Sequence, residues 1–288
     1  MTAVLRSWLY VPGHRADRIT KALSCGADAV VVDLEDAVPP EQKATARAGA
    51  RAALEARRGD HPQLWVRIND PGGRWGEADL DALAGSGVSG LRIPRAEDPE
   101  LIRQVAERAG VPLQLLIESA AGLLRAAELA AAHPLVSGVG LGEADLAADL
   151  RLRSDSGLGW ARGCVVVAAR SAGLPPPVQS VWTAVDDLDG LRASSERGRA
   201  LGFLGRSVIH PRQVPVVHEV FTPSDAEIAA ANEVLRAAES AAAGGETAFI
   251  DATGGFVDPA VVERARVVLA VAAEHDRSQN PPHQRGER

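Results

Sequence analysis

The chain has 288 residues, and its hydrophobic share of 46% is enough for one large core. Its 31 basic and 38 acidic residues give a net charge of -7, which argues against a nucleic-acid backbone or an anionic membrane as the main partner. Cys25 and Cys164 are its only cysteines, and no apolar run approaches the ~18 residues of a membrane helix. We therefore expect a soluble, cytoplasmic protein without disulfides.

Eight short β-type segments recur along the chain, with helical patterns between them. They cover residues 8–11, 29–33, 64–68, 91–93, 113–117, 136–141, 178–181 and 204–209. Near-continuous apolar strands that alternate with amphipathic helices are typical of a parallel sheet buried on both faces. Intervening segments such as 41–57 and 99–109 are rich in good helix formers and would make an outer ring. Eight such repeats predict an α/β fold, the (β/α)₈ TIM barrel.

The residues after the predicted barrel read as a separate helical extension. One helix would run from Ala226 to Ala243 and another from Pro259 to about Ala273, with a small hairpin between them. No large apolar side chain occurs from Asp276 onward, so the end of the chain should be disordered. The predicted division is a barrel with the active site at residues 1–222, a helical extension at 223–275 and a disordered tail at 276–288.

Two carboxylates stand at equivalent positions after neighbouring strand segments. Glu118 directly follows residues 113–117, and Asp145 comes four residues after 136–141. Catalytic groups of a barrel lie at the C-terminal ends of its strands, so both side chains should face one site. Mg²⁺ needs only one or two carboxylates besides waters and substrate oxygens, and the chain has no His-rich or Cys-rich alternative. We interpret the two residues as Mg²⁺ ligands; the simpler view is a solvated carboxylate and a helix-start residue.

A charged residue interrupts the apolar segment 64–68. Burial of Arg67 would be unfavourable unless its guanidinium points into a polar pocket. Its partners could be Asp33, Glu35 or Asp36, at the end of the second segment. In catalysis, the same guanidinium could grip a carboxylate or enolate oxygen. Three acidic residues so close together need a nearby cation. We interpret these carboxylates as hydrogen-bond partners that hold Arg67 and metal-bound waters in place; a solvated acidic loop is the alternative.

Six motifs occur in a fixed order along the chain. They are residues 6–13, 33–38 with Lys43 and Arg47, 66–69, 117–119, 142–146 and 202–211. Together they resemble the citrate lyase β-subunit-like family of the HpcH/HpaI aldolase superfamily, over roughly residues 5–270. The resemblance implies a (β/α)₈ barrel with a C-terminal helical lid, assembled as a homotrimer or hexamer.

The resemblance also implies roles for single residues. The metal ligands would be Glu118 and Asp145, and the catalytic residues would be Arg67 and Asp258. Glu35 and Asp36, from the acidic group after the second segment, are further catalytic candidates. Contacts to the substrate and its thioester carrier would come from Arg67, Glu118, Ala144, Asp145, Tyr10, Arg15, Lys21, Ile209 and His210. Asp258 would act from the lid of a neighbouring subunit, although an aspartate before a proline is equally expected as a helix cap. From the residues alone, His210 would more simply shape a pocket, because no Ser or Cys partner pattern accompanies it.

Relatives in this family cleave a 3-hydroxyacyl thioester into an acetyl-type thioester and a 2-oxo acid. The resemblance therefore predicts a Mg²⁺-dependent carbon–carbon lyase that cleaves citramalyl-, malyl- or citryl-CoA into acetyl-CoA and a 2-oxo acid by retro-Claisen chemistry. Two alternatives remain open: a citryl-acyl-carrier-protein lyase subunit of a citrate lyase complex, and a malyl-CoA thioesterase on the same scaffold.

Four positions depart from the usual family pattern. The acidic neighbour of Asp145 is Glu143, one place earlier than is common. Arg95 and Arg206 stand where lysine is usual, and Gln179 stands where an aspartate often occurs. These departures leave open which 2-oxo acid is used and whether the carrier is CoA or an acyl carrier protein.

Overall fold

The computed structural model describes residues 4–57, 59, 62–250 and 254–279. Leu5–Glu219 form one compact unit, and Val4 and the described residues from Val220 onward form a second unit. Within the described residues, every helix is too short or too polar to cross a lipid bilayer. The first unit contains all the predicted site residues except Asp258, so its construction determines the geometry of the site.

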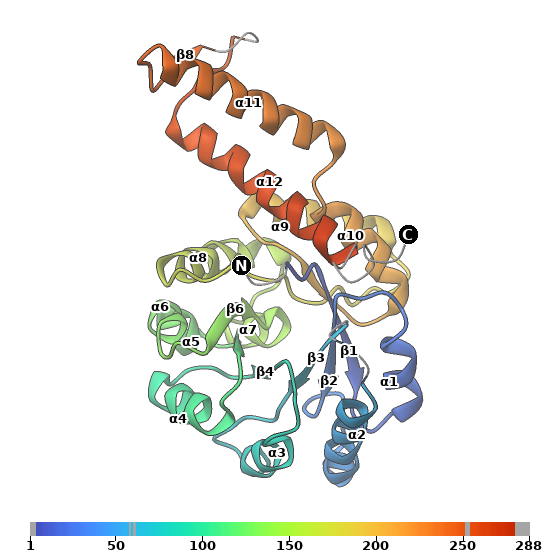
Figure 1. Ribbon diagram of the computed structural model, residues 1–288. Coiled ribbons are helices and arrows are strands. Elements are labelled where there is room, and N and C mark those ends of the chain that lie inside the picture. Colours follow the sequence, from blue (N-terminus) through green and yellow to red (C-terminus); the bar gives the residue numbers. More distant parts are fainter. Residues whose placement is uncertain (1–3, 58, 60–61, 251–253, 280–288) are drawn as a thin grey trace. The chain divides into compact units, whose positions relative to one another are not determined.

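Seven parallel strands form the centre of the first unit, counted over the described residues (Figure 1). They are β1 (Ser7–Pro12), β2 (Ala29–Asp33), β3 (Gln63–Arg67), β4 (Gly90–Ile93), β5 (Leu113–Ile117), β6 (Val136–Leu141) and β7 (Arg206–Val208). Neighbouring strands pair in the order β6-β5-β4-β3-β2-β1-β7. All five residues of β2 are buried, as expected for an inner strand that is covered on both faces.

Residues 178–181, predicted as a strand, do not form one. Gln179 alone pairs with the sheet, through an isolated bridge to Arg206 in β7. The prolines at 175–177 have no backbone N–H to donate, so in that direction the segment only accepts, as the carbonyl oxygen of Pro177 does from the N–H of Leu204 at 2.9 Å. Within the described residues, the α/β fold is therefore a curled seven-stranded parallel sheet with helices, and the eighth predicted segment adds a single bridge to it.

Ser180 replaces the missing ladder on the β6 side of this segment. Its hydroxyl donates to the carbonyl oxygen of Leu141 at the end of β6. It also accepts, at 3.2 Å, from the backbone N–H of Glu143, the first residue of α7 (Glu143–Asp149). One side chain thus links the segment to β6 and fixes the point where α7 begins.

The curl of the sheet brings β4 and β7 within reach of one side chain. Nη1 of Arg92 in β4 donates to Oγ of Ser207 in β7 at 2.9 Å, although β3, β2 and β1 lie between these strands in the sheet order. A core cluster that includes Trp8, Val31 and Trp65 packs in the same unit, with the two indole rings 5.0 Å apart. The curled sheet therefore has an interior that is filled by side chains.

Helices follow the strands and lie around the sheet (Figure 1). Besides α7 they are α1 (Ala16–Ala22), α2 (Lys43–Ala56), α3 (Gly76–Leu83), α4 (Pro99–Ala109), α5 (Ala120–Leu124), α6 (Ala126–Ala130), α8 (Gly159–Ser171), α9 (Leu188–Leu201) and α10 (Val214–Phe221). The limits of α4 follow from its sequence, because Asp98 accepts from the N–H of Glu100 at 3.0 Å and Pro99 takes the first position. Gly110 ends the helix with a φ of 63°, which favours glycine.

The second unit consists of two long helices and a short hairpin. α11 (Asp225–Ala243) and α12 (Pro259–Gln279) pack against each other, and β8 (Phe249–Ile250) pairs antiparallel with β9 (Phe256–Val257). Ser224 caps α11 reciprocally: its hydroxyl accepts from the N–H of Glu227 at 3.3 Å, and the Glu227 carboxylate accepts from the N–H of Ser224 at 2.8 Å. α12 runs past its predicted end at Ala273, so residues 276–279 of the predicted tail are helical, while residues 280–288 lie outside the described residues.

Candidate active site

Arg67 is the last residue of β3 and is surrounded by carboxylates. Parallel pairing in register puts it opposite Asp33, the last residue of β2. Nε and Nη2 of Arg67 each lie 2.7 Å from an oxygen of Asp33, which makes a bidentate ion pair. Nη1 lies 3.1 Å from Oδ2 of Asp36 and 2.9 Å from Oε2 of Glu35. The structure thus brings Arg67 together with the whole acidic group that follows β2.

The acidic turn after β2 is held by buried polar contacts, so it is not a solvated loop. Asp33 is 1% exposed, and its carboxylate also accepts from the N–H groups of Glu35 at 3.0 Å and Ala37 at 3.1 Å. Nζ of Lys43 donates to the carbonyl oxygens of Leu34 and Glu35 at 2.7 and 2.8 Å. These contacts fix the turn, and with it the carboxylates around Arg67, in the free protein.

Glu118 directly follows β5 and is only 8% exposed. Its Oε2 accepts from the backbone N–H of Arg95 at 2.9 Å. Arg95 has a φ of 49°, a left-handed conformation that is strained for a residue with a side chain. A Cβ placed on Gly142 would lie 2.5 Å from Oε1 of Glu118, so only glycine leaves room for this carboxylate. Glu118 is therefore held between the turn after β4 and the end of β6.

Burial raises the pKa of Glu118 to about 7. The N–H of Arg95 and the charge of Arg67 oppose this shift, whereas the negative charges of Asp145 and Asp36 add to it. Burial also raises the pKa of Glu35 to about 8, against the attraction of Arg67. Oε2 of Glu35 has no well-aligned hydrogen bond, although Nη1 of Arg67 lies 2.9 Å away. A divalent cation bound beside these carboxyl groups would favour their ionised form and displace the protons that burial makes them hold.

Glu118 and Asp145 could supply two oxygen ligands to such a cation. Asp145 is exposed in the first turn of α7, next to Ala144, and its charge acts on the pKa of Glu118. Among the described residues, no group of three or more His, Cys, Asp or Glu side chains is arranged to hold a metal. A pair of carboxylates with positions left for water and substrate suits Mg²⁺, whereas structural zinc needs four protein ligands.

Tyr10 and Arg92 extend this cluster into the interior of the sheet. The ring centroid of Tyr10 lies 5.1 Å from Cζ of Arg67 and 5.4 Å from Cζ of Arg92. Arg92 is 2% exposed and belongs to β4, between Leu91 and Ile93. Sequence reasoning missed this arginine, although the pattern that singles out Arg67, a charge inside an apolar strand, also occurs here.

Four other predicted residues follow β1 or β7 and make local contacts. Arg15 pairs with Asp17 through two hydrogen bonds of 3.0 and 2.9 Å, and Lys21 is exposed in the last turn of α1. Ile209 is 40% exposed, and Nδ1 of His210 caps the short 3-10 helix that follows β7. Because all the strands are parallel, Arg15, Ile209 and His210 lie at the same end of the sheet as Arg67, whereas Lys21 lies further along α1. None of the four takes part in the described contacts of the cluster around Arg67.

Asp258 lies in the second unit, where its carboxylate caps a helix. Oδ1 accepts from the backbone N–H of Val261 at 2.9 Å, at the start of α12. This contact is the capping role expected of an aspartate before Pro259. The catalytic role that the resemblance implies for Asp258 stays a prediction.

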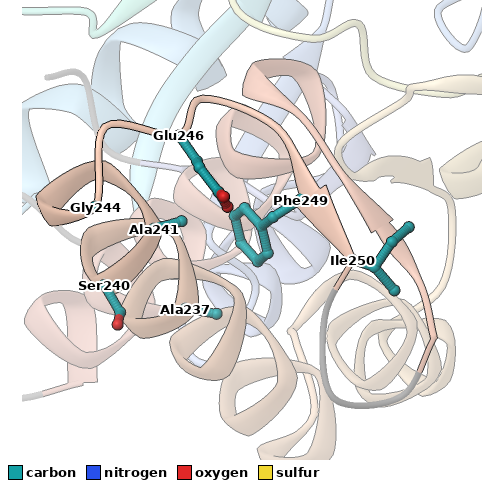
Figure 2. A pocket seen from close by; sticks show the side chains of 7 residues that line it. All are labelled: Ala237, Ser240, Ala241, Gly244, Glu246, Phe249 and Ile250. Carbon is teal, nitrogen blue, oxygen red and sulfur yellow. The ribbon is translucent and has the colours of Figure 1, made fainter.

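A hollow of about 430 Å³ opens in the second unit between the end of α11 and β8 (Figure 2). Its lining consists of Ala237, Ser240, Ala241, Gly244, Glu246, Phe249 and Ile250. Glu246 is the only charged group of this lining, which has no arginine or histidine to work with it. The candidate active site is therefore the group of charged residues at the strand ends of the first unit.

A family model described as HpcH/HpaI aldolase/citrate lyase matches residues 6–211. The chain belongs to this family. A (3S)-malyl-CoA thioesterase of Cereibacter sphaeroides is 39% identical over 269 residues, which cover 92% of each chain. An L-malyl-CoA/beta-methylmalyl-CoA lyase of the same species is 34% identical over 302 residues, which cover 93% of this chain and 94% of that one.

A solved structure from the same family is similar over almost the whole chain. It is the protein CitE from Mycobacterium tuberculosis in complex with magnesium, acetoacetate and coenzyme A. Its sequence is 33% identical, the TM-score is 0.81, and the match covers 94% of this chain and 99% of that one. The likeness therefore extends over both units of the present chain.

Gln179 and Arg206, two positions where we expect other residues in the family, form one buried pair. Nη1 of Arg206 lies 3.4 Å from Oε1 of Gln179 and 3.1 Å from the hydroxyls of Ser194 and Ser195 in α9. Gln179 is 4% exposed and Arg206 is 3% exposed, and burial lowers the pKa of Arg206 to about 10. The pair therefore joins the sheet to α9, and neither side chain is exposed to meet a carrier molecule.

Glu143, the acidic residue that we expect one place later, pairs with Arg162 of α8. Nε and Nη2 of Arg162 lie 2.8 and 2.7 Å from the two oxygens of Glu143, and Nη1 also donates to Asp155 at 3.0 Å. Hydrogen bonds to the two carboxylates raise the pKa of Arg162 above its ordinary value. The shifted carboxylate thus anchors the first residue of α7, two places before Asp145. Sequence reasoning singled out Glu143 but missed its partner.

Proposed function

We propose that this protein is a Mg²⁺-dependent carbon–carbon lyase that cleaves a β-hydroxyacyl-CoA, of the citramalyl, malyl or citryl type, into acetyl-CoA and a 2-oxo acid. The observation that carries the proposal is the buried carboxylate of Glu118 after β5, at the same end of the sheet as Arg67 on β3 and Asp145 in the first turn of α7. The magnesium, acetoacetate and coenzyme A bound to the similar CitE structure support the same ligand classes here.

The metal would be held by Glu118 and Asp145. When bound, Mg²⁺ would supply Lewis-acid stabilisation of the substrate's oxygens and hold them in place for cleavage. Glu118 would provide a ligand whose position is set in advance by the N–H of Arg95 and by the glycine at Gly142. Asp145, at the exposed start of α7, would provide the second ligand from a neighbouring strand end.

Arg67 would offset the negative charge that develops on the enolate oxygen as the carbon–carbon bond breaks. Asp33 holds Nε and Nη2, so the guanidinium needs little reorganisation when substrate arrives. Nη1 contacts Asp36, whose side chain is 67% exposed and can give way to a substrate oxygen. A preorganised donor of this kind is worth about 3 kcal/mol of transition-state stabilisation.

Proton movement would involve the remaining acidic candidates. Burial raises the pKa of Glu35 to about 8, and its carboxyl group, 2.9 Å from Nη1 of Arg67, would keep that arginine and nearby waters oriented. Asp258, supplied by the second unit of a neighbouring subunit in a homotrimer or hexamer, would move the proton at the acetyl carbon. Tyr10, Arg15, Lys21, Ile209 and His210 would line the site of the thioester carrier, with Ala144 next to the substrate.

The direct test is to incubate the purified protein with citramalyl-, malyl- and citryl-CoA in the presence of Mg²⁺. The proposal expects acetyl-CoA together with pyruvate, glyoxylate or oxaloacetate, respectively, from at least one of them. Citryl-acyl carrier protein, tested in parallel, would show whether a carrier protein is required. A protein that binds Mg²⁺ but turns over none of these thioesters would count heavily against the lyase.

A thioesterase is the second candidate, favoured by the malyl-CoA thioesterase that is 39% identical over 92% of the chain. A thioesterase would convert malyl-CoA and water into malate and free CoA, whereas a lyase would yield acetyl-CoA and glyoxylate. A thiol-reactive dye detects free CoA and does not detect acetyl-CoA, because the sulfur of acetyl-CoA is acylated. The two products therefore separate the candidates in one assay.

A further inference from the structure

Arg92 lies inside the curled sheet without a carboxylate partner. Nη1 donates to Oγ of Ser207 at 2.9 Å, and Nε is buried without an acceptor. Within the described residues, no carboxylate lies at ion-pair distance from this guanidinium, whereas the neighbouring Arg67 has three such partners. Burial of an unpaired charge opposes folding, so Arg92 needs a reason beyond packing.

Aromatic rings take the place of a counter-ion around Arg92. Its Cζ lies 5.0 Å from the ring centroid of Trp8 and 5.4 Å from that of Tyr10, two residues on the same face of β1. The ring of Tyr10 also has Cζ of Arg67 at 5.1 Å. Two positively charged guanidinium groups therefore contact one phenol ring, each by a cation–π interaction.

We propose that Arg92 is a positioning residue, which fixes the ring of Tyr10 against Arg67 and so sets the direction in which Arg67 meets the substrate. Asp33 and Glu35 hold the guanidinium of Arg67 from the side of β2, and Tyr10 contacts it from β1. Arg92 in turn restrains Tyr10 from β4. The substrate part of this inference rests on the proposed function, and it takes Arg67 to contact the carboxylate of the 2-oxo acid as well as the enolate oxygen.

A purely structural role would give different results. If Arg92 only connects β4 to β7, its packing and its hydrogen bond to Ser207 are sufficient. As a positioning residue, it needs its charge over the ring of Tyr10. Tyr10 is the only tyrosine of the chain, so isotope-labelled tyrosine gives a single ring environment to follow by NMR.

The experiment compares Arg92→Met, Arg92→Lys and the double variant Arg92→Met/Ser207→Ala with the wild type. The double variant removes both hydrogen-bond partners, so that no buried hydroxyl is left unpaired. The control is Arg192→Met, which removes an arginine from an exposed ion pair with Glu219. Thermal unfolding, the NMR signal of Tyr10, Mg²⁺ affinity and the affinity for pyruvate in the presence of Mg²⁺ are measured for each protein.

We expect the double variant to unfold at a temperature no lower than the wild type, because an unpaired buried charge has been removed. The Tyr10 signal should shift in Arg92→Met and return toward its wild-type position in Arg92→Lys, which keeps the charge. Pyruvate should bind Arg92→Met roughly tenfold more weakly, since a misplaced binding group loses affinity, while Mg²⁺ affinity stays unchanged. In turnover, kcat should fall as KM rises, because a displaced Arg67 also loses its contact with the developing enolate charge.

Two outcomes would overturn this inference. The first is a Tyr10 signal that Arg92→Met leaves unchanged, whatever the substrate is. The second is a double variant that unfolds at a lower temperature than the wild type but binds pyruvate with wild-type affinity. That result is expected if Arg92 only connects β4 to β7. Failure of the proposed function looks different: the wild type itself would turn over no thioester, and the Tyr10 signal would then decide the role of Arg92.

Discussion

Asp33 and Arg67 end two neighbouring parallel strands in register, and both oxygens of the aspartate meet the guanidinium at 2.7 Å. The ion pair follows from the strand register, because a shift by one residue would turn one side chain to the other face of the sheet. This geometry fixes the plane of the guanidinium and leaves Nη1 as the part that faces Glu35 and Asp36.

Replacement of Arg67 by lysine should lower kcat by roughly 10²–10³, because a point charge cannot keep the bidentate pair with Asp33 and still face the substrate. Mg²⁺ affinity should stay close to the wild-type value, since Arg67 is not among the proposed ligands. Steady-state kinetics and titration calorimetry measure the two effects. Arg192→Lys, in an exposed ion pair, is the matched control. Wild-type kcat in Arg67→Lys would remove Arg67 from the mechanism.

Magnesium affinity should rise with pH and level off above pH 7, the region in which Glu118 titrates in the free protein. Below this pKa the metal must displace a proton from Glu118, so each lower pH unit weakens binding by up to about tenfold. Glu118→Gln should lose most of the affinity and most of the pH dependence, and Asp145→Asn should also bind weakly. Calorimetry over a pH series provides the test. Unaltered magnesium binding in both variants would contradict the proposed ligands.

Arg162→Gln should weaken Mg²⁺ binding by roughly tenfold, the usual size of effect when a residue that supports a metal ligand is lost. The physical reason is that Glu143 loses its bidentate partner, so the start of α7 and therefore Asp145 are less firmly held. Arg162→Lys should recover part of the affinity. If the two side chains act as one unit, Glu143→Gln combined with Arg162→Gln should be no worse than either change alone. Additive losses would mean that they act separately.

Acid should destabilise the protein through Asp28. Burial would raise the pKa of Asp28, but hydrogen bonds with His218 and Arg6 outweigh burial and hold this pKa well below its usual range. A carboxylate with a lowered pKa in the folded state stabilises the fold above its unfolded pKa of about 3.9, and the benefit is lost as the pH falls below that value. Asp28→Asn should cost about 3 kcal/mol at neutral pH and flatten this acid dependence.

Denaturant unfolding of both proteins from neutral pH down to about pH 3 measures the contribution of Asp28. The exposed carboxylate of Glu219, changed to glutamine, is the control and should have little effect on stability. An acid dependence that is equally steep in Asp28→Asn and in the wild type would show that other carboxylates cause it.

The sequence predicts β1 to β6 closely because each is a short apolar run buried in a parallel sheet. It fails at residues 178–181, where two of the four residues are polar. There Gln179 makes only an isolated bridge to β7, and the hydroxyl of Ser180 makes the contact to β6. The contact of Arg67 with the acidic turn could be expected, because both follow from strand ends in one sheet.

Contacts between distant segments were out of reach of the sequence. Arg162 meets Glu143 only because α8 packs near the start of α7, and no local pattern marks that meeting. In the sequence, Gln179 and Arg206 are two separate positions that bear on carrier binding. In the structure they contact each other and are buried. Arg92 was within reach, since a charge inside an apolar strand is visible in the sequence.

The turn after β4 holds Glu118 through the main chain of residue 95, while the side chain of Arg95 is exposed. The identity of that side chain is therefore free to change without moving the carboxylate. A substitution at this position would change the surface charge beside Glu118 and leave the backbone hydrogen bond to its carboxylate in place. Glycine would fit its left-handed backbone best and would remove that charge altogether.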